Sequence, residues 1–312
     1  MSLRFPARVA TRLLQSLIVL FTVYTVTFVM IVAVPGNPFQ REGARALAPD
    51  VERGLRERYG MQSNVRFYVD YLRRVMHGDL GVSLEYRNWT CNQIIADALP
   101  VSMAIGAVAI AVAALAGVTL GAASAVRPGG WIDLAAMGLA ALAVSIPTFV
   151  VAAVLLVLFS VTWPMLPAGQ WSGPLDLIRP AVALSLVPMA YVTRLTRSGM
   201  IEAMSADYVR TARAKGLSER HVVWRHALPN ALLPVVNYLG PAAAWTMTGS
   251  FVVERVFNIP GLGTHFVNGV LNRDQMLVLA VVLVFSTIIL LFNLLVDLAC
   301  AWLDPRVGDA AQ

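Results

Sequence analysis

The sequence predicts an all-α membrane protein with six transmembrane helices and a small helical subdomain after the first of them. Composition is the first reason: only 13% of the 312 residues are charged and 58% are hydrophobic, whereas a soluble domain carries about 25% charge. The second is that apolar segments recur along the chain, each close to the roughly 20 residues that span a bilayer. The third is that the arginines are scattered between these segments, which indicates membrane orientation rather than nucleic-acid binding.

Six apolar segments account for the expected transmembrane helices. They are residues 13–34, 99–126, 134–161, 178–195, 231–253 and 276–302. Pro35 and Gly36 end the first. Pro147 in the third, and Pro180 and Pro188 in the fourth, predict kinks, which neighbouring helices in a bundle accommodate.

The basic residues at the N-terminus set the expected orientation. Arg4, Arg8 and Arg12 precede the first helix with no acidic residue nearby, and the positive-inside rule places them in the cytoplasm. No small-residue cleavage site follows the first apolar segment, so we expect it to be kept rather than removed as a signal peptide. With six helices, both termini are then cytoplasmic. Residues 127–133, 196–230 and the C-terminal tail fall inside, and residues 35–98, 162–177 and 254–275 fall outside.

The long outer segment is expected to fold rather than to serve as a linker. Pro49–Tyr59 and Val65–His77 both have helical spacing of apolar residues. The expected organisation is a cytoplasmic N-terminus with the first helix (1–34), an external helical subdomain (35–98), a core of five helices (99–303) and a cytoplasmic tail (304–312). Cys91 and Cys300 lie in very different contexts, so we expect neither a disulfide framework nor a metal site.

Several kinds of chemistry have no support in the sequence. A P-loop needs Lys followed by Ser or Thr, but Lys215 is the only lysine and Gly216 follows it. Neither a His-Glu-x-x-His nor a Gly-x-Ser-x-Gly motif occurs. His221 and His226 are five residues apart, so we expect them not to share a helix face. We therefore predict no catalytic residue, no metal ligand and no cofactor on this chain. Ionisable groups are also scarce deep in the apolar segments, which counts against an ion-coupled carrier.

One basic segment interrupts the apolar pattern between residues 207 and 230. Ser205 is an expected N-cap, and Asp207 lies in the first turn of a helix that Gly216 should end. Ser218 should then cap a second helix that continues through Ala227. The first helix carries small residues, including Ala212, between basic ones. Two interpretations remain at this point, a solvated loop and a docking element that lets another surface approach closely.

The spacing within this segment resembles a loop of ABC-importer permeases. That loop reads Glu-Ala-Ala, three residues, Gly, nine residues, Ile-x-Leu-Pro, and this sequence keeps Ala212, Gly216, Leu228 and Pro229 but departs from it at three positions. The departures are Arg210, Thr211 and His226. Further segments resemble the dipeptide/oligopeptide/nickel class, and the long outer segment resembles its B-type permease. These segments are Pro35-Gly36-Asn37-Pro38, Gly78-Asp79-Leu80-Gly81-Val82-Ser83, Ser145-Ile146-Pro147-Thr148-Phe149, Arg194-Leu195-Thr196-Arg197-Ser198, Phe257-Asn258-Ile259-Pro260-Gly261-Leu262-Gly263 and Asp304-Pro305-Arg306.

The resemblance implies a type I ABC-importer permease fold and a place in the bacterial inner membrane. It implies a second, C-type permease, two ABC ATPase subunits that carry ATP and Mg, and an extracytoplasmic solute-binding protein. Peptides or similar small solutes would be imported, and dipeptides, oligopeptides, glutathione, nickel complexes and oligosaccharides all remain open. The alternatives are an exporter-type permease and a membrane-embedded enzyme or scaffold without an ATPase partner.

The resemblance also implies roles for individual residues. The cytoplasmic loop 199–230 would couple the membrane helices to the ATPases. The expected coupling residues are Asp207, Tyr208, Arg210, Ala212, Arg213, Lys215, Gly216 and Leu217. An outer gate or a contact with the binding protein is expected at Glu254, Asn258, Pro260 and Gly261.

Overall fold

The computed structural model describes residues 4–39, 48–86, 88–165, 171, 173–248 and 250–303. Within these ranges every regular element is a helix, and the only β pairing is an isolated bridge between Val82 and Thr90. The chain forms two compact units, Met1–Val101 with Pro260–Leu290, and Ser102–Ile259 with Leu291–Gln312. We describe each unit by itself. The C-terminal tail 304–312, with its Asp-Pro-Arg motif, lies outside the described residues.

The first unit joins the N-terminal helix to the outer segment. Its helices are α1 (Arg4–Ala33), α2 (Pro49–Arg58), α3 (Asn64–Met76), the beginning of α4 (Cys91–Val126), α13 (Leu262–Leu271) and the first part of α14 (Gln275–Leu303). Both helices expected in the outer segment are therefore confirmed. Pro49 starts α2, where the missing N–H costs nothing. Ser63 caps α3 by accepting a hydrogen bond from the backbone N–H of Arg66 at 3.2 Å.

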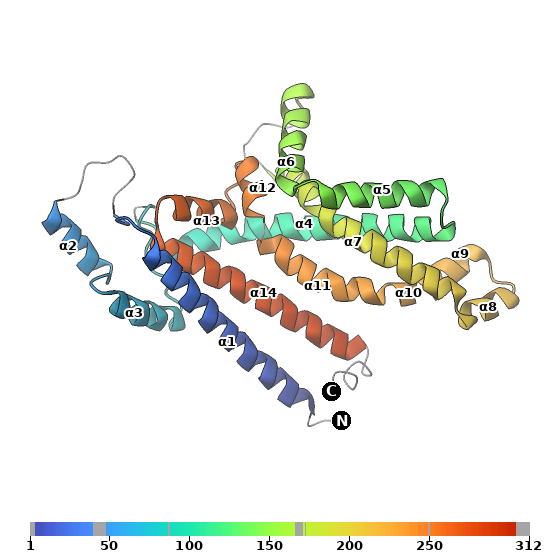
Figure 1. Ribbon diagram of the computed structural model, residues 1–312, viewed down its shortest axis with the longest axis horizontal. Coiled ribbons are helices and arrows are strands. Elements are labelled where there is room, and N and C mark those ends of the chain that lie inside the picture. Colours follow the sequence, from blue (N-terminus) through green and yellow to red (C-terminus); the bar gives the residue numbers. More distant parts are fainter. Residues whose placement is uncertain are drawn as a thin grey trace. The chain divides into compact units, whose positions relative to one another are not determined.

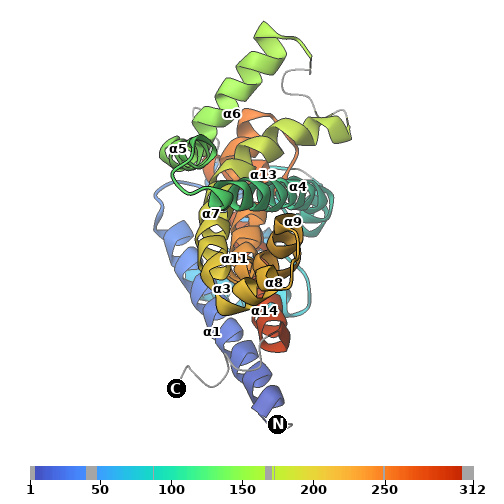
Figure 2. The same ribbon diagram turned by 90° about the vertical axis from the view of Figure 1, so that its right-hand side faces the viewer.

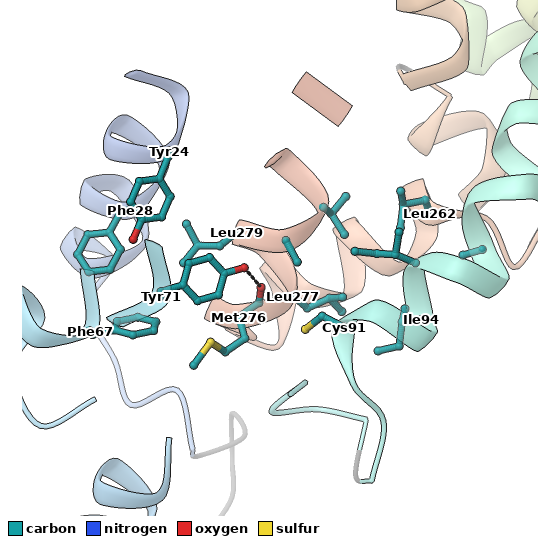
Figure 3. Close-up of a cluster of buried hydrophobic side chains, with 14 of the residues drawn as sticks. Tyr24, Phe28, Phe67, Tyr71, Cys91, Ile94, Leu262, Met276, Leu277 and Leu279 are labelled. Atoms are coloured by element: carbon teal, nitrogen blue, oxygen red, sulfur yellow. Dashed lines mark hydrogen bonds between the residues drawn. The ribbon is translucent and has the colours of Figure 1, made fainter. Parts of the chain in front are cut away.

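Aromatic side chains hold α3 against α1 in this unit (Figure 3). Tyr24 and Phe28 from α1 face Phe67 and Tyr71 from α3, and all four are buried. The Tyr24 hydroxyl donates to the Tyr68 carbonyl at 2.6 Å. Buried aromatic rings contribute large apolar area, and their polar tips need a partner. The outer segment is therefore an ordered part of the first unit.

A single buried carboxylate fastens the loop before α4 to the start of α14. Asp274 is fully buried. One of its oxygens accepts from the Ser83 hydroxyl at 2.5 Å and from the backbone N–H groups of Leu84 at 3.0 Å and Glu85 at 3.2 Å. The other accepts from the Leu277 N–H at 3.0 Å and so caps α14. Asp274 thus joins segments about 190 residues apart in the chain.

The second unit contains the remaining helices, with α7 packed against most of them (Figure 1). They are the rest of α4, α5 (Trp131–Ser145), α6 (Thr148–Leu156), the π-helix η1 (Val157–Thr162), the 3-10 helix η2 (Pro174–Leu177), α7 (Ile178–Ser205), α8 (Asp207–Ala214), α9 (Glu219–His221), the π-helix η3 (Val222–Ala227), α10 (Leu228–Ala231), α11 (Leu233–Thr248), α12 (Phe251–Val256) and the end of α14. Contacts join α7 to α5, α6, α10 and α11.

The expected third transmembrane helix is broken rather than kinked. Residues 131–145 and 148–162 meet at 99° (Figures 1 and 2). Pro147 disfavours the helical conformation at Ile146, which has an extended ψ of 124°. The expected fifth helix is also divided, into α10, α11 and α12. By length and composition, four described helices can cross a membrane, or five if the bent pair is one span. The multi-pass architecture is confirmed, and the count of six remains a prediction.

Glycines allow α4 and α7 to approach closely within the second unit. A Cβ atom on Gly121 would lie 2.5 Å from the Thr193 carbonyl oxygen, and one on Gly117 would lie 2.7 Å from the Val192 side chain. Small residues of this kind let the backbones of membrane helices come together. The contact between α4 and α7 therefore depends on the absence of a side chain at both positions.

We expect Gly121→Val to lower the thermal unfolding midpoint of the purified protein. The added side chain overpacks the contact with α7 and should cost about 1–3 kcal/mol or more. Gly138→Val is the matched control, because Gly138 lies inside α5 and a Cβ there would meet no atom within 4 Å. Intrinsic fluorescence during heating in detergent measures both variants. Equal midpoints for the two would contradict the close approach of α4 and α7.

Candidate coupling segment

The basic segment begins where α7 ends. Ala206 adopts an extended conformation with ψ of 151°, and α8 starts at Asp207. The expected N-cap at Ser205 is wrong. Ser205 still belongs to the last turn of α7, where its hydroxyl donates to the Glu202 carbonyl at 2.7 Å instead of capping α8. Ala206 occupies the N-cap position and makes no side-chain hydrogen bond.

Gly216 ends α8 as expected. Its φ of +79° is in the left-handed region that glycine adopts without a steric penalty. The Gly216 N–H donates to the Arg213 carbonyl at 2.9 Å, and the Leu217 N–H donates to the Ala212 carbonyl at 3.4 Å. This pair of bonds is a Schellman motif. It fixes the direction in which the chain leaves α8.

One face of α8 is covered by the chain itself. Val209 and Ala212 are buried, at 0% and 5% exposure. They belong to one hydrophobic cluster with residues of α4, α7, η3 and α10. The other buried members are Ala122, Ala125, Met200, Ala203, Val222, Ala227, Leu228 and Ala231. The expectation that a partner protein closes over Ala212 is therefore corrected, because this small face attaches α8 to its own membrane helices.

The opposite face of α8 and the turn that follows it are exposed and carry the other expected coupling residues. Tyr208 is 42% exposed and Leu217 38%. The charged residues there are also exposed. They are Asp207, Arg210, Arg213 and Lys215. In this conformation, a partner can reach the tyrosine, the leucine and these charges.

An ion pair closes the turn between α8 and α9. Arg213 donates two hydrogen bonds to the Glu219 carboxylate, at 2.8 and 3.2 Å. The hydrogen bond to Glu219 raises the pKa of Arg213 above the usual value for arginine. Ser218 is the N-cap residue of α9, as expected, although its side chain makes no capping bond.

The histidines of this segment lie closer together than their spacing suggested. The ring centroids of His221 and His226 are 5.8 Å apart. The expectation that they do not share a face assumed α-helical geometry and is wrong. Residues 222–227 form the π-helix η3, in which residues five apart come into register.

An ion pair between α5 and α7 was not expected from the sequence. Arg197 donates two hydrogen bonds to Asp133, at 2.5 and 2.8 Å, and Asp133 also accepts from the Gly129 N–H at 2.8 Å. Asp133 is buried. The sequence signal for this ion pair was Asp133 itself, an acidic residue in the first turn of an otherwise apolar helix. That signal does not identify Arg197 as the partner.

The residues of the expected outer group differ in exposure and are divided between the two units. Glu254 is fully buried in the second unit, and the Ser250 hydroxyl donates to its carboxylate. Its burial argues against direct contact with an external protein in this conformation, and the expected role in an outer gate remains a prediction. Asn258 is exposed and takes a left-handed φ of 51° after α12. Pro260 is exposed and Gly261 is the buried N-cap of α13, and both belong to the first unit.

Comparison with known proteins identifies the family. Residues 117–309 match the family described as "Binding-protein-dependent transport system inner membrane component". The chain belongs to this permease family. It is 39% identical to the dipeptide transport system permease protein DppB of Bacillus subtilis over 289 aligned residues. The alignment covers 92% of this chain and 93% of DppB. The chain is 41% identical over 299 residues to the oligopeptide transport system permease protein OppB of Salmonella typhimurium, which covers 95% of this chain and 97% of the relative.

A solved structure supports the fold of this permease. The structure titled "Crystal structure of an amino acid ABC transporter with histidines" matches with a TM-score of 0.53 at 17% identity, over 66% of this chain and 92% of the other. The type I importer permease fold is thus shown. As a subunit of a binding-protein-dependent system, the permease is a transport component rather than an enzyme, and the exporter and membrane-enzyme alternatives lose their support.

Proposed function

We propose that this permease, together with a second C-type permease, forms the path for peptides or similar small solutes in an ATP-driven importer. The observation that carries the proposal is the 39–41% identity, over more than nine-tenths of the chain, to permeases named for dipeptide and oligopeptide transport. An external solute-binding protein delivers the solute. Two ABC ATPase subunits on the cytoplasmic side bind ATP and Mg.

The coupling segment has the two contacts that transmission of movement requires. Its exposed side, with Tyr208, Leu217 and the basic residues, docks on an ATPase subunit. Its buried side, with Val209 and Ala212, packs against α7, α10 and α4. Closure of the ATPases on ATP displaces α8, and the packed cluster passes that displacement to the membrane helices. ATP and the loaded binding protein each favour a different state of the path.

Reconstitution tests the proposed function directly. We expect proteoliposomes with both permeases, both ATPases and the binding protein to take up a labelled tripeptide when ATP is on the ATPase side. The chain purified alone should hydrolyse no ATP, since it has no P-loop. Uptake that proceeds without ATP, or ATP turnover by the isolated chain free of contaminants, would contradict the proposal.

The orientation gives a second test, in which the choice of residue follows from the structure. Cys91 is fully buried and is a poor reporter. We therefore propose to replace Cys91 and Cys300 by serine and to introduce His77→Cys or Ala214→Cys, since both sites are exposed. A membrane-impermeant maleimide should label the first in intact spheroplasts and the second only after lysis. The reverse pattern would overturn the cytoplasmic placement of α8.

A further inference from the structure

The second unit contains a large hollow of about 590 Å³ with walls from α6, α7, α11 and α12. Aromatic and hydroxyl side chains line much of it. They include Thr148, Phe149, Tyr191, Tyr238, Trp245 and Thr246. Binding pockets for small molecules span about 300–1,000 Å³. This hollow is large enough for a short peptide.

Interrupted backbone surrounds the hollow on several sides. Pro188 lies inside α7 and Pro241 inside α11, and both prolines line it. Pro188 has no N–H to donate to the carbonyl of Leu184, which also lines the hollow. Thr148 follows the break between α5 and α6. Backbone breaks at membrane depth occur where they are buried in protein or line a water-filled cavity, and not against lipid. The wall therefore suits a polar occupant.

The side chains of the wall are uncharged, and apolar residues alternate with the polar groups of Thr148, Tyr191, Tyr238, Trp245 and Thr246. No lining residue that the structure describes is Asp, Glu, Lys, Arg or His. Tyr191 and Tyr238 face each other with ring centroids 5.4 Å apart, and their hydroxyls can donate or accept. Trp245, on α11, is 77% exposed. The surface thus combines neutral hydrogen-bonding groups with accessible rings.

We propose that this hollow binds the backbone of the peptide during its passage, an inference that rests on the proposed function. The tyrosine hydroxyls pair with peptide amide groups, which every peptide carries. Trp245 and Phe149 contact the side chains, which differ from one peptide to the next. Because the wall has no charge, it does not favour acidic, basic or neutral side chains. Selection by charge then belongs to other parts of the importer.

Photo-crosslinking locates the peptide in the complete importer. The probe is a tripeptide with a central benzophenone residue, delivered by the binding protein to reconstituted transporter. We expect crosslinks on the α7 and α11 wall, and excess unlabelled tripeptide should suppress them. Crosslinks confined to the second permease, or to parts of this chain away from the hollow, would overturn the inference while uptake of the probe still supported the proposed function. If the wild-type importer takes up no peptide, both the proposed function and the inference about the hollow are contradicted.

Substitutions in the wall test the chemistry. We expect Tyr191→Phe, Tyr238→Phe and Trp245→Ala each to lower the peptide imported per ATP hydrolysed by about three- to tenfold, the effect of losing one neutral contact. The factor should be the same for tripeptides with a central Lys, Glu or Ala. Trp131→Ala is the matched control, because Trp131 is 79% exposed on α5 and does not line the hollow. An equal effect of the two tryptophan substitutions, or a loss that depends on peptide charge, would contradict the inference.

Discussion

Ala212→Glu is expected to abolish peptide uptake by detaching the coupling helix from the membrane helices that carry it. Ala212 is 5% exposed within the cluster that joins α8 to α4, α7, η3 and α10. A glutamate there overfills the contact and takes a carboxylate into a site without a partner for it. Together these effects should cost about 3 kcal/mol or more, which is more than about 100-fold in the equilibrium for docking α8. Uptake by reconstituted transporter measures the loss.

Ala214→Glu separates detachment from a failure to dock. Ala214 lies on the same helix but is exposed, so the same substitution leaves α8 packed on its own chain. Trypsin should therefore cut after Arg210, Arg213 or Lys215 faster in Ala212→Glu than in the wild type. In Ala214→Glu the cleavage rate should equal that of the wild type. The exposed variant should keep α8 resistant to trypsin but weaken ATPase co-purification, and uptake should fall with that loss of docking. Wild-type uptake by Ala212→Glu would show that α8 does not transmit movement through this face.

The second large effect is expected from Asp274→Ala in the first unit. The substitution removes the acceptor of the Ser83 hydroxyl and of the Leu84 and Leu277 N–H groups. The Glu85 N–H also loses its bond to Asp274 but keeps the one to the Ser83 hydroxyl oxygen at 3.2 Å. Buried donors that lose a charged acceptor should together cost about 3 kcal/mol or more. The thermal unfolding midpoint and the yield of folded protein should both fall. Differential scanning fluorimetry in detergent reports the midpoint.

Two variants make this result specific to the carboxylate contacts. Asp97→Ala removes an acidic side chain from an exposed position of α4 and should leave the midpoint unchanged within about 0.5 kcal/mol of stability. Asp274→Asn keeps one acceptor oxygen and should lie between Asp274→Ala and the wild type. If Asp274→Ala unfolds at the wild-type temperature, the loop 83–85 is not held to α14 through this residue.

The elements that local chemistry specifies were predictable from the sequence. The apolar spacing of the outer segment located α2 and α3 to within one residue of their observed ends. Gly216 was expected to be left-handed, because the helix before it had to end and glycine reaches that conformation without strain. In the same way, the order of apolar segments was sufficient to predict a multi-pass membrane protein. In each case the deciding interactions are close in sequence.

The features that depend on distant segments were not predictable. A small-residue face on α8 fits a partner's groove and the chain's own helices equally well, so the burial of Ala212 had to come from the structure. Pro147 predicts a kink, but the right-angle turn between α5 and α6 depends on how each half packs. The approach of His221 and His226 required a π-helix, which their spacing alone does not reveal. Glu254 follows the fifth apolar segment and was therefore expected at the outer surface. Its side chain is fully buried within the second unit, which the sequence does not reveal.

The division of α8 into a covered and an open side makes its attachment separable from its choice of partner. Val209 and Ala212 pack only against residues of their own chain, so a related permease with a different ATPase can keep both residues. Tyr208, Leu217 and the neighbouring charges are free to change with the surface they meet. To couple this permease to a different ATPase, it should therefore suffice to substitute the exposed residues and to keep the buried cluster that attaches α8 to the membrane helices.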